Sequence, residues 1–244
     1  MKRSKSVNPP QLGALVPSFN EARRLPAVLR VLQKVEGIDA IYCVDDGSTD
    51  GTPELIRRAF PKVKLLALPR NRGKAAAVRA AAQKMGCQYV MTIDADLQRL
   101  NRKDLEAGIR EVRANPNIDM LLFVRLPEVW WARLVRGNDL FSGERILLRE
   151  DLLKVIRSKP VQGYQLEVAI NQFMIEHKKV VRRMPLHCQP VLAARKVGLR
   201  AGSKKELGMV RSIFAYVGLG GFLRQFFWFP PFSRVTRVNN HIHS

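Results

Sequence analysis

The sequence predicts an α/β domain in which helices cover both faces of a mostly parallel β-sheet. Five short apolar runs alternate with helical patterns along the first half of the chain, and each run ends in polar or turn residues, as buried parallel strands do. A chain of 244 residues with 46% hydrophobic and 26% charged residues has room for one such domain with a single core. The expected strands are Leu12–Val16, Ala40–Val44, Val63–Leu68, Tyr89–Ile93 and Met120–Val124.

The segments between the expected strands have the patterns of helices that pack on a sheet. Ala75–Lys84 is rich in alanine, which favours helix and allows close packing. Two other segments repeat apolar residues at the spacing of one helix face. They do so at Leu25, Val28, Leu29 and Leu32, and at Leu105, Ile109 and Val112. Because strands and helices alternate, we expect ligands to bind at the carboxyl ends of parallel strands.

The charge of the chain indicates an anionic partner or substrate. The 42 Lys and Arg residues against 21 Asp and Glu residues give a formal net charge of +21. From His177 onward, 13 Lys and Arg residues accompany a single acid, Glu206, so we expect the anionic partner to bind mainly there. Nucleic acid, an anionic membrane surface and phosphorylated substrates remain open. We expect residues 1–11 to form a flexible basic arm, 12–200 the domain, and 201–244 a basic aromatic segment.

Cysteine usage and hydropathy favour a cytoplasmic protein. Cys43, Cys87 and Cys188 form no CxxC pair, which argues against a disulfide framework and a zinc site. Met1–Pro10 is basic but precedes no apolar run, unlike a signal peptide. The longest apolar run, Ser212–Leu223, has 12 residues. A helix needs about 20 to cross a bilayer.

Acidic and polar residues gather where three of the expected strands end. These stretches are Pro17–Glu21, Asp45–Thr52 and Asp94–Gln98. Carboxylates at one edge of a sheet repel one another unless cations or hydrogen-bond donors offset them, so the pattern indicates a divalent metal or a bound nucleotide. For Ser48–Thr52 an alternative stays open, in which these residues cap the helix that begins near Pro53.

The Asp-x-Asp pair Asp94 and Asp96 has no such capping role, because the next helix is expected only from about Lys103. Oxygen ligands after a buried strand suit a hard cation. Between the acidic stretches, Gly73 begins the alanine-rich helix within the basic run Arg70–Lys74, which offers backbone N–H groups and positive charge to a phosphate. A solvated basic turn is the alternative for this run.

Four of these motifs, in this order and spacing, resemble the family 2 glycosyltransferases of the GT-A fold, which is Rossmann-like. The branch that looks most similar contains dolichol-phosphate mannose synthases and other polyprenyl-phosphate sugar transferases. The resemblance implies a nucleotide-sugar half over residues 12–100 and an acceptor half over residues 101–200. The motifs are Pro17–Glu21, Val44–Thr52, Asn71–Lys74 and Asp94–Gln98.

The resemblance implies a donor site for a UDP- or GDP-sugar, with Mg²⁺ or Mn²⁺ as cofactor. It implies that Asp96 serves the reaction through a metal that bridges the diphosphate and neutralises the departing nucleotide, with inversion at the sugar. The implied metal ligands are Asp94, Asp96, Gln98 and, further along the chain, His187. The residues implied in nucleotide-sugar binding are Pro17, Phe19, Glu21, Asp45, Asp46, Arg72, Lys74, Asp94 and Ala95.

On the acceptor side, the resemblance places Ser142, Glu144 and Arg145 beside the acceptor. Glu167 is implied as a general base if the acceptor is a hydroxyl group, whereas a phosphate acceptor needs none. The alternative for Glu167 is a first-turn acid that interacts with a helix dipole, and for His187 an ordinary surface residue.

The expected acceptor is polyprenyl phosphate, and a soluble or saccharide hydroxyl acceptor is the alternative. Only 17 residues separate Val124 from Ser142, fewer than the mannose synthases carry there, which weakens the case for a lipid. Arginines near this stretch remain candidates for an acceptor phosphate. They are Arg125, Arg133 and Arg136.

The C-terminal stretch Met209–Phe232 holds 8 of the chain's 18 aromatic residues and has basic flanks. This composition suits a segment at the interface of an anionic membrane, and hence a peripheral position on the cytoplasmic membrane face. Packing on the domain or in a dimer is the alternative. A basic nucleic-acid- or membrane-binding protein without catalysis is the alternative of another class, and the acid-lined rim argues against specific nucleic-acid binding.

Overall fold

The computed structural model describes residues 11–126, 142–158 and 165–189, together with six residues between Tyr216 and Gln225. Within these ranges lie seven strands and six helices. In chain order they are β1 (Leu12–Ser18), α1 (Leu25–Leu32), β2 (Ala40–Asp45), α2 (Thr52–Ala59), β3 (Lys64–Ala67), α3 (Lys74–Lys84), β4 (Tyr89–Thr92), α4 (Arg102–Ala114), β5 (Met120–Leu126), β6 (Arg145–Leu148), α6 (Arg149–Ser158), α7 (Gln165–Glu176) and β7 (Val181–His187).

The strands form one mixed sheet in the order β3-β2-β1-β4-β6-β5-β7. All neighbouring strands pair in parallel except β6, which is antiparallel to both β4 and β5. The five strands expected from the sequence are present, and the mostly parallel sheet is confirmed. β6 and β7 were not expected as strands.

The antiparallel direction of β6 matters for the site. Its first residue, Arg145, pairs with Thr92 near the end of β4 and with Leu122 of β5. The chain therefore enters β6 at the same rim where the parallel strands end. Ser142 and Glu144, which precede Arg145, lie at that rim for the same reason.

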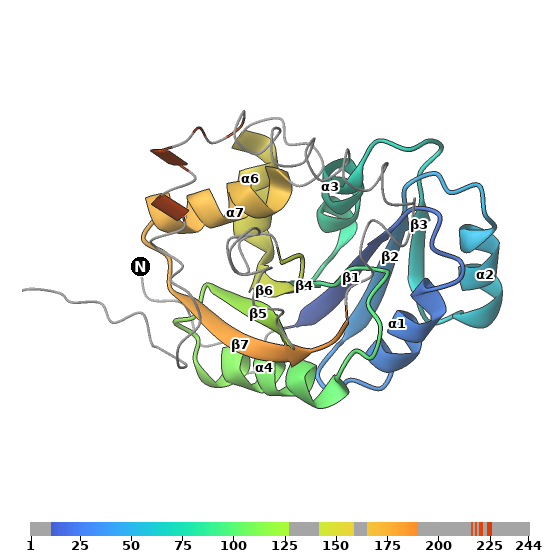
Figure 1. Cartoon of the computed structure of the whole chain (residues 1–244), viewed down its shortest axis with the longest axis horizontal. Coiled ribbons are helices and arrows are strands. Elements are labelled where there is room, and N and C mark those ends of the chain that lie inside the picture. Colours follow the sequence, from blue (N-terminus) through green and yellow to red (C-terminus); the bar gives the residue numbers. More distant parts are fainter. Residues whose placement is uncertain are drawn as a thin grey trace, which may run out of the picture.

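Helices cover both faces of the sheet, as expected (Figure 1). α1, α2 and α4 pack on one face and α3, α6 and α7 on the other, each set with its own cluster of buried residues. The alanines of α3 allow the close approach that the sequence indicated, since Ala75, Ala77, Ala81 and Ala82 are buried in the second cluster.

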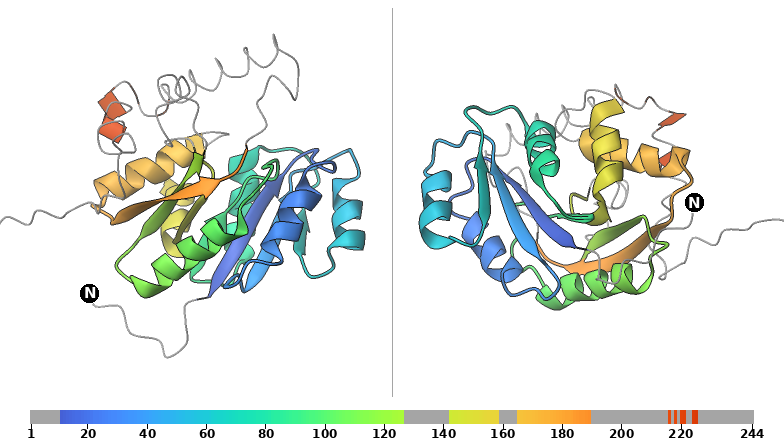
Figure 2. Two further views of the ribbon diagram at one scale, coloured as in Figure 1. Left: turned by 60° about the horizontal axis from the view of Figure 1, so that its bottom comes forward. Right: turned by 180° about the vertical axis from the view of Figure 1, so that it is seen from behind.

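The described part of the C-terminal segment lies beside α7 (Figure 2). Tyr216 packs against the cluster that α7 shares, and Gln225 Nε2 donates a hydrogen bond to the Val168 carbonyl at 3.2 Å. Residues 1–10 and the aromatic run 226–232 lie outside the described residues. Among the residues described, no helix is both long and apolar enough to cross a membrane.

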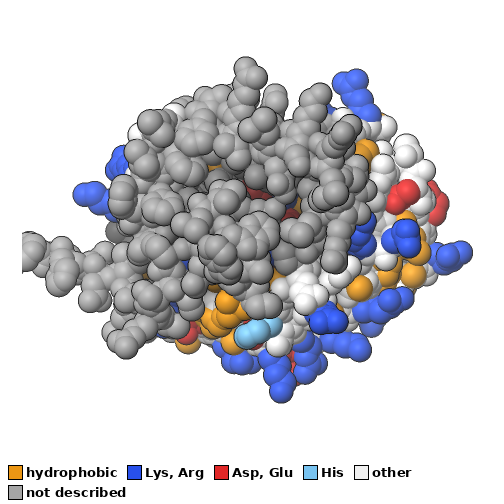
Figure 3. Space-filling model, viewed as in Figure 1, with side chains coloured by type: hydrophobic (Ala, Val, Ile, Leu, Met, Phe, Trp, Pro, Cys, Tyr) orange, Lys and Arg blue, Asp and Glu red, His pale blue; other side chains and the backbone are white. Residues whose placement is uncertain are grey.

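Basic side chains dominate parts of the described surface (Figure 3). On α4 the exposed charged residues are all basic, and its acids are buried or half-buried. Two of those acids contact neighbouring side chains, Glu106 with Arg102 at 3.3 Å and Asp104 with His187 at 2.8 Å. The excess positive charge of the chain is therefore presented to solvent here.

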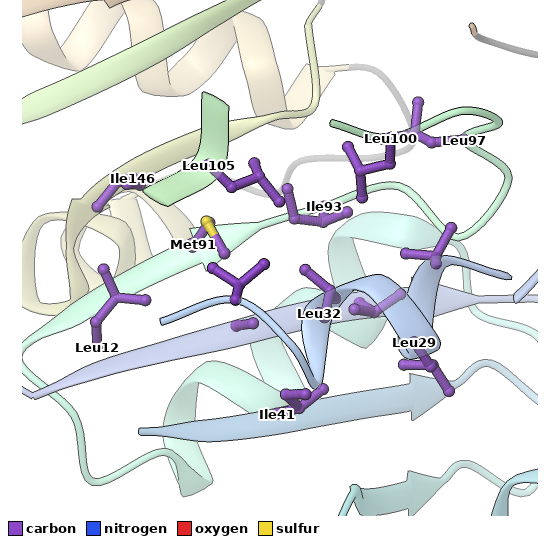
Figure 4. Packing of buried hydrophobic residues seen from close by; sticks show 14 of the residues in the cluster. Leu12, Leu29, Leu32, Ile41, Met91, Ile93, Leu97, Leu100, Leu105 and Ile146 are labelled. Carbon is purple, nitrogen blue, oxygen red and sulfur yellow. The ribbon is translucent and has the colours of Figure 1, made fainter. Parts of the chain in front are cut away.

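The cluster beneath α1 and α4 fills the face of the sheet with branched side chains (Figure 4). α4 comes especially close to β5 at Gly108. A Cβ atom there would lie 2.5 Å from the ring of the buried Phe123. The distance between helix and strand thus depends on the absence of a side chain at position 108.

We predict that Gly108→Val destabilises the fold by about 1–3 kcal/mol through overpacking. Valine has a higher helix propensity than glycine, so helix propensity alone predicts that the substitution would stabilise the fold. Ala107→Val, at the adjacent half-buried position, is the matched control and should lower the free energy of unfolding clearly less than Gly108→Val does. Urea unfolding of both variants measures the difference, and equal stabilities would contradict the packing argument.

A candidate active site at the carboxyl ends of the strands

Lys74, the first residue of α3, lies at the centre of the rim. Its Nζ donates to Asp94 Oδ1 at 2.7 Å and to Glu167 Oε1 at 2.7 Å. Asp94 lies two residues beyond the end of β4, and Glu167 lies in the first turn of α7. One ammonium group therefore connects three segments that are far apart in the sequence.

Arg125, near the end of β5, holds the other oxygen of Asp94. Its Nη2 donates to Asp94 Oδ2 at 3.0 Å, and its Nε and Nη2 donate to the two oxygens of Glu144 at 2.6 and 2.8 Å. Ser142 Oγ donates to Glu144 Oε2 at 2.9 Å. Both oxygens of Asp94 thus accept hydrogen bonds from cations.

Together with Arg145, these residues form what we call the charge network. It contains three cations and three carboxylates, so its formal charge is zero. Its members are Lys74, Arg125, Arg145, Asp94, Glu144 and Glu167.

The charges of the network shift the pKa values of Asp94 and Lys74. Burial favours the neutral form of Asp94, but Lys74 and Arg125 outweigh burial and hold the pKa of Asp94 well below its ordinary value. Burial likewise lowers the pKa of Lys74, and the nearby Asp94 and Glu167 more than offset it, so that this pKa is raised. Asp94 is therefore a carboxylate and Lys74 an ammonium at neutral pH.

Gly143 allows the backbone to approach this network. A Cβ atom at this position would lie 2.6 Å from Asp94 Oδ1 and 2.9 Å from Lys74 Nζ. The Gly143 carbonyl also accepts a hydrogen bond from Thr92 Oγ1 at 2.6 Å. A side chain at position 143 would displace the carboxylate of Asp94 or the ammonium group of Lys74, so glycine suits this close approach.

The three residues that the resemblance implies beside the acceptor are buried in this structure. Ser142, Glu144 and Arg145 are 6%, 0% and 1% exposed. Arg145 donates to Asn171 Oδ1 at 3.1 Å and to backbone carbonyls of Ser142 and Glu167. Arg145 begins the unexpected strand β6, and Ser142 and Glu144 directly precede it. All three therefore lie in the interior, where they contact members of the charge network.

Asp45 and Asp46, which the resemblance implies in nucleotide-sugar binding, are buried as well. They are 1% and 3% exposed. Asp45 Oδ2 accepts the Ser48 N–H at 2.9 Å, and Asp46 accepts the N–H groups of Arg72 and Gly73 at 2.9 and 2.7 Å. Both carboxylates therefore hold loops in place. The N–H groups of Arg72 and Gly73, which the sequence suggested for a phosphate, are already bound.

The first motif is held against the second by loop hydrogen bonds. Asn20 N–H donates to Ser48 Oγ at 2.8 Å, and the Thr49 N–H donates to Asn20 Oδ1 at 2.9 Å. This arrangement leaves the Phe19 ring 42% exposed, whereas Glu21 is 8% exposed and pairs with Arg24 at 2.7 Å.

The first residue of that motif lies at the same rim. Pro17 is half-buried in β1, where it pairs with Val44. Of the residues implied in binding a nucleotide, Phe19 thus presents the largest apolar surface to solvent within the described ranges.

The segment after Asp94 lies beside the end of β7. Gln98 and Gln189 exchange two backbone hydrogen bonds of 2.9 and 2.7 Å. Ala95 is buried, Asp96 is half-buried and Gln98 is exposed. His187, just before Gln189, is exposed, and its Nδ1 lies 2.8 Å from Asp104 Oδ2.

Within the described part of the chain, no cluster of three or more His, Cys, Asp or Glu residues is arranged to hold a metal by itself. Mg²⁺ commonly takes only one or two carboxylates from the protein and completes its shell with substrate phosphates and water. Carboxylate and amide oxygens, such as those of Asp96 and Gln98, are the donor types that it prefers.

Sequence reasoning did not assign Arg125 to this network, although it lies at the end of an expected strand, where a charged side chain meets the rim. Asn171 and Thr92 gave no signal in the sequence. Arg133 and Arg136, the other arginines considered for an acceptor phosphate, lie outside the described residues.

A family model described as "Glycosyl transferase family 2" matches residues 14–184. The chain belongs to glycosyl transferase family 2. Among its curated relatives, the dolichyl-phosphate beta-glucosyltransferase of Mus musculus is 35% identical over 100 residues, which are 35% of this chain and 31% of the relative. The undecaprenyl-phosphate 4-deoxy-4-formamido-L-arabinose transferase of Aeromonas hydrophila is 38% identical over 95 residues, 36% of this chain and 29% of the relative.

This family 2 chain therefore aligns with about a third of the length of these relatives. Among solved structures, glucosyl-3-phosphoglycerate synthase from Mycobacterium tuberculosis, in complex with Mn²⁺, UDP and glucosyl-3-phosphoglycerate, superposes with a TM-score of 0.66 at 18% identity. The match covers 86% of this chain and 80% of that one. The expected GT-A fold is confirmed, and so is the resemblance to the polyprenyl-phosphate branch.

We predict that Asp46→Asn loosens the loop before α3, since an amide has one oxygen for the two N–H groups of Arg72 and Gly73. A buried donor left without its partner costs roughly 1–3 kcal/mol. Amide hydrogen exchange at Arg72 and Gly73 should speed up, and urea unfolding should report lower stability. Glu54→Gln, at an exposed acid, is the control that should change neither.

Proposed function

We propose that this protein transfers a sugar from a UDP- or GDP-sugar to polyprenyl phosphate, with Mg²⁺ or Mn²⁺ as cofactor. The observation that carries the proposal is the charge network around Lys74 and Asp94, next to Asp96, at the carboxyl ends of the strands in a family 2 fold. Such a rim is where α/β sheets bind their ligands.

For the donor, we assign the base and ribose to Pro17, Phe19 and Glu21. The exposed Phe19 ring offers a flat apolar surface to a base. Lys74 is about a quarter exposed, so a diphosphate can reach its ammonium group. We also assign Arg72 to the diphosphate. We propose that Asp45 and Asp46 hold the loops that contain Ser48 and Arg72.

For the metal, we assign Asp96 with Gln98 as ligands. The two carboxylate oxygens of Asp94 accept hydrogen bonds from Lys74 and Arg125. We therefore propose that Asp94, together with Ala95, orients the sugar and the diphosphate and does not bind the metal. His187 remains a candidate through Nε2, because metal-binding histidines commonly direct the other ring nitrogen to a carboxylate, as His187 does to Asp104. When bound, the metal would neutralise charge on the departing nucleoside diphosphate.

For the acceptor, Glu167 favours a phosphate over a hydroxyl group. A hydroxyl must lose a proton when it attacks, whereas a phosphate oxygen is already ionised. Glu167 is 3% exposed and its Oε1 accepts from the Lys74 ammonium, so it acts as a counter-ion and is poorly placed to take a proton. The other carboxylate oxygen of Glu167, Oε2, is buried without a hydrogen-bond partner. Since this oxygen could accept a proton, a hydroxyl acceptor stays as the alternative.

The names of the two relatives, which refer to dolichyl phosphate and undecaprenyl phosphate, support the same acceptor class. Polyprenyl phosphates are lipids, so the proposal has the protein act at a membrane surface. We place it on the cytoplasmic face, where the basic residues after His177 suit an anionic bilayer.

The test is to incubate the protein and Mn²⁺ with labelled UDP- and GDP-sugars and a polyprenyl phosphate in detergent, then to separate organic and aqueous phases. We expect label from one donor in the organic phase and none when EDTA removes the metal. Consumption of a donor with label only in the aqueous phase would instead support the soluble acceptor. No consumption of any donor would contradict the proposal.

We predict that Asp96→Asn lowers kcat by at least about 100-fold, in line with the loss of a group that stabilises charge in the transition state. The fold should persist, since Asp96 is only half-buried. Glu111→Gln, at a half-buried acid on α4 away from the rim, is the control and should keep full activity. Initial rates at saturating donor measure the effect, and an active Asp96→Asn variant would refute the metal assignment.

A further inference from the structure

We propose that Glu144 is a positioning residue that holds Arg125 on Asp94 and does not touch the acceptor. This inference rests on the proposed function, because it assigns a role within the same site. It replaces the expectation from the sequence, in which Glu144 lies beside the acceptor.

The first step is that no oxygen of Glu144 is left for a ligand. The residue is 0% exposed. Oε1 accepts from Arg125 Nη2 at 2.8 Å, and Oε2 accepts from Arg125 Nε at 2.6 Å and from Ser142 Oγ at 2.9 Å. Ser142 Oγ also lies 2.9 Å from the carbonyl oxygen of Phe123 in β5. This contact holds the Ser142 hydroxyl, and with it the Glu144 carboxylate, against β5.

The second step is that a two-point contact fixes the plane of the guanidinium group. Arginine and a carboxylate that share two hydrogen bonds have a defined mutual orientation, which a single contact does not give. The same Nη2 that contacts Glu144 donates to Asp94 Oδ2 at 3.0 Å. The orientation of Arg125 therefore determines where the Asp94 carboxylate points.

The third step concerns Lys74, the other cation on Asp94. A donor diphosphate would bind the ammonium group of Lys74 and so weaken the hydrogen bond from Lys74 to Asp94 Oδ1. The contact from Arg125 then remains to keep Asp94 in place. Without Glu144, Arg125 is a partly buried cation whose main partner is Asp94, and it is free to rotate with that carboxylate.

The experiment is a double-mutant cycle with Glu144→Gln, Arg125→Gln and the double variant. Glutamine keeps the size of glutamate and one acceptor oxygen but removes the charge. We expect Glu144→Gln to lower kcat/KM for the donor roughly 10–100-fold, as loss of an outer-shell partner does. KM for the acceptor should stay within about two-fold, because Glu144 is fully buried.

The double variant gives the decisive result. If Glu144 acts only through Arg125, the double variant is no worse than Arg125→Gln alone. If the two losses multiply, or if Glu144→Gln raises mainly the acceptor KM, Glu144 contacts the acceptor and the inference is overturned. The affinity for nucleoside diphosphate with Mn²⁺, measured by calorimetry, should follow the same non-additive pattern.

Asp151→Asn is the matched control for the loss of a buried charge. Asp151 is also 0% exposed and pairs with Lys179 at 2.8 Å, beside Asp119 at the other end of β5. It should lower thermal stability without changing kcat/KM. If Glu144→Gln alone does not fold, the double variant, which removes both charges of the pair, still allows comparison with Arg125→Gln.

Failure of the proposed function is recognised separately. In that case the wild-type protein consumes no donor under any condition. A crystal structure of Glu144→Gln then still tests the inference. We expect Arg125 to have turned away from Asp94 Oδ2, and an unchanged Arg125–Asp94 contact would overturn it.

Discussion

The ammonium group of Lys74 is the contact on which the rim of the sheet depends. Asp94 and Glu167 come from different segments, and each lies 2.7 Å from this one cation. Without it, two carboxylates would share a partly buried space and repel each other. Gly143 is constrained by the same contact, because a side chain there would collide with Asp94 and Lys74.

The charge of the site contrasts with that of the chain. The protein carries a formal charge of +21, yet the charge network at the rim is neutral. Buried charges are tolerated only when they are paired, so the surplus of Lys and Arg lies elsewhere, including on the exposed side of α4. Under the proposed function, an anionic substrate would meet a basic surface and then a site where it competes with Asp94 for Lys74.

Local patterns predicted the parallel strands and the helices on both faces of the sheet. Apolar runs ended by turn residues identify buried strands in any context. The role of Asp46 was beyond such patterns, because its partners, Arg72 and Gly73, are 26 and 27 residues away. The resemblance implied Glu144 and Arg145 beside the acceptor. Their burial depends on partners from other segments, Arg125 for Glu144 and Asn171 for Arg145, which a local pattern does not reveal.

The measurement that tests the account most directly is a crystal structure of this chain with a nucleoside diphosphate and Mn²⁺. The account predicts phosphate oxygens within hydrogen-bonding distance of Lys74 Nζ, the metal on Asp96, and Arg125 still bound to Glu144 and Asp94. A nucleotide bound away from the rim, with Lys74 still held only by Asp94 and Glu167, would contradict it.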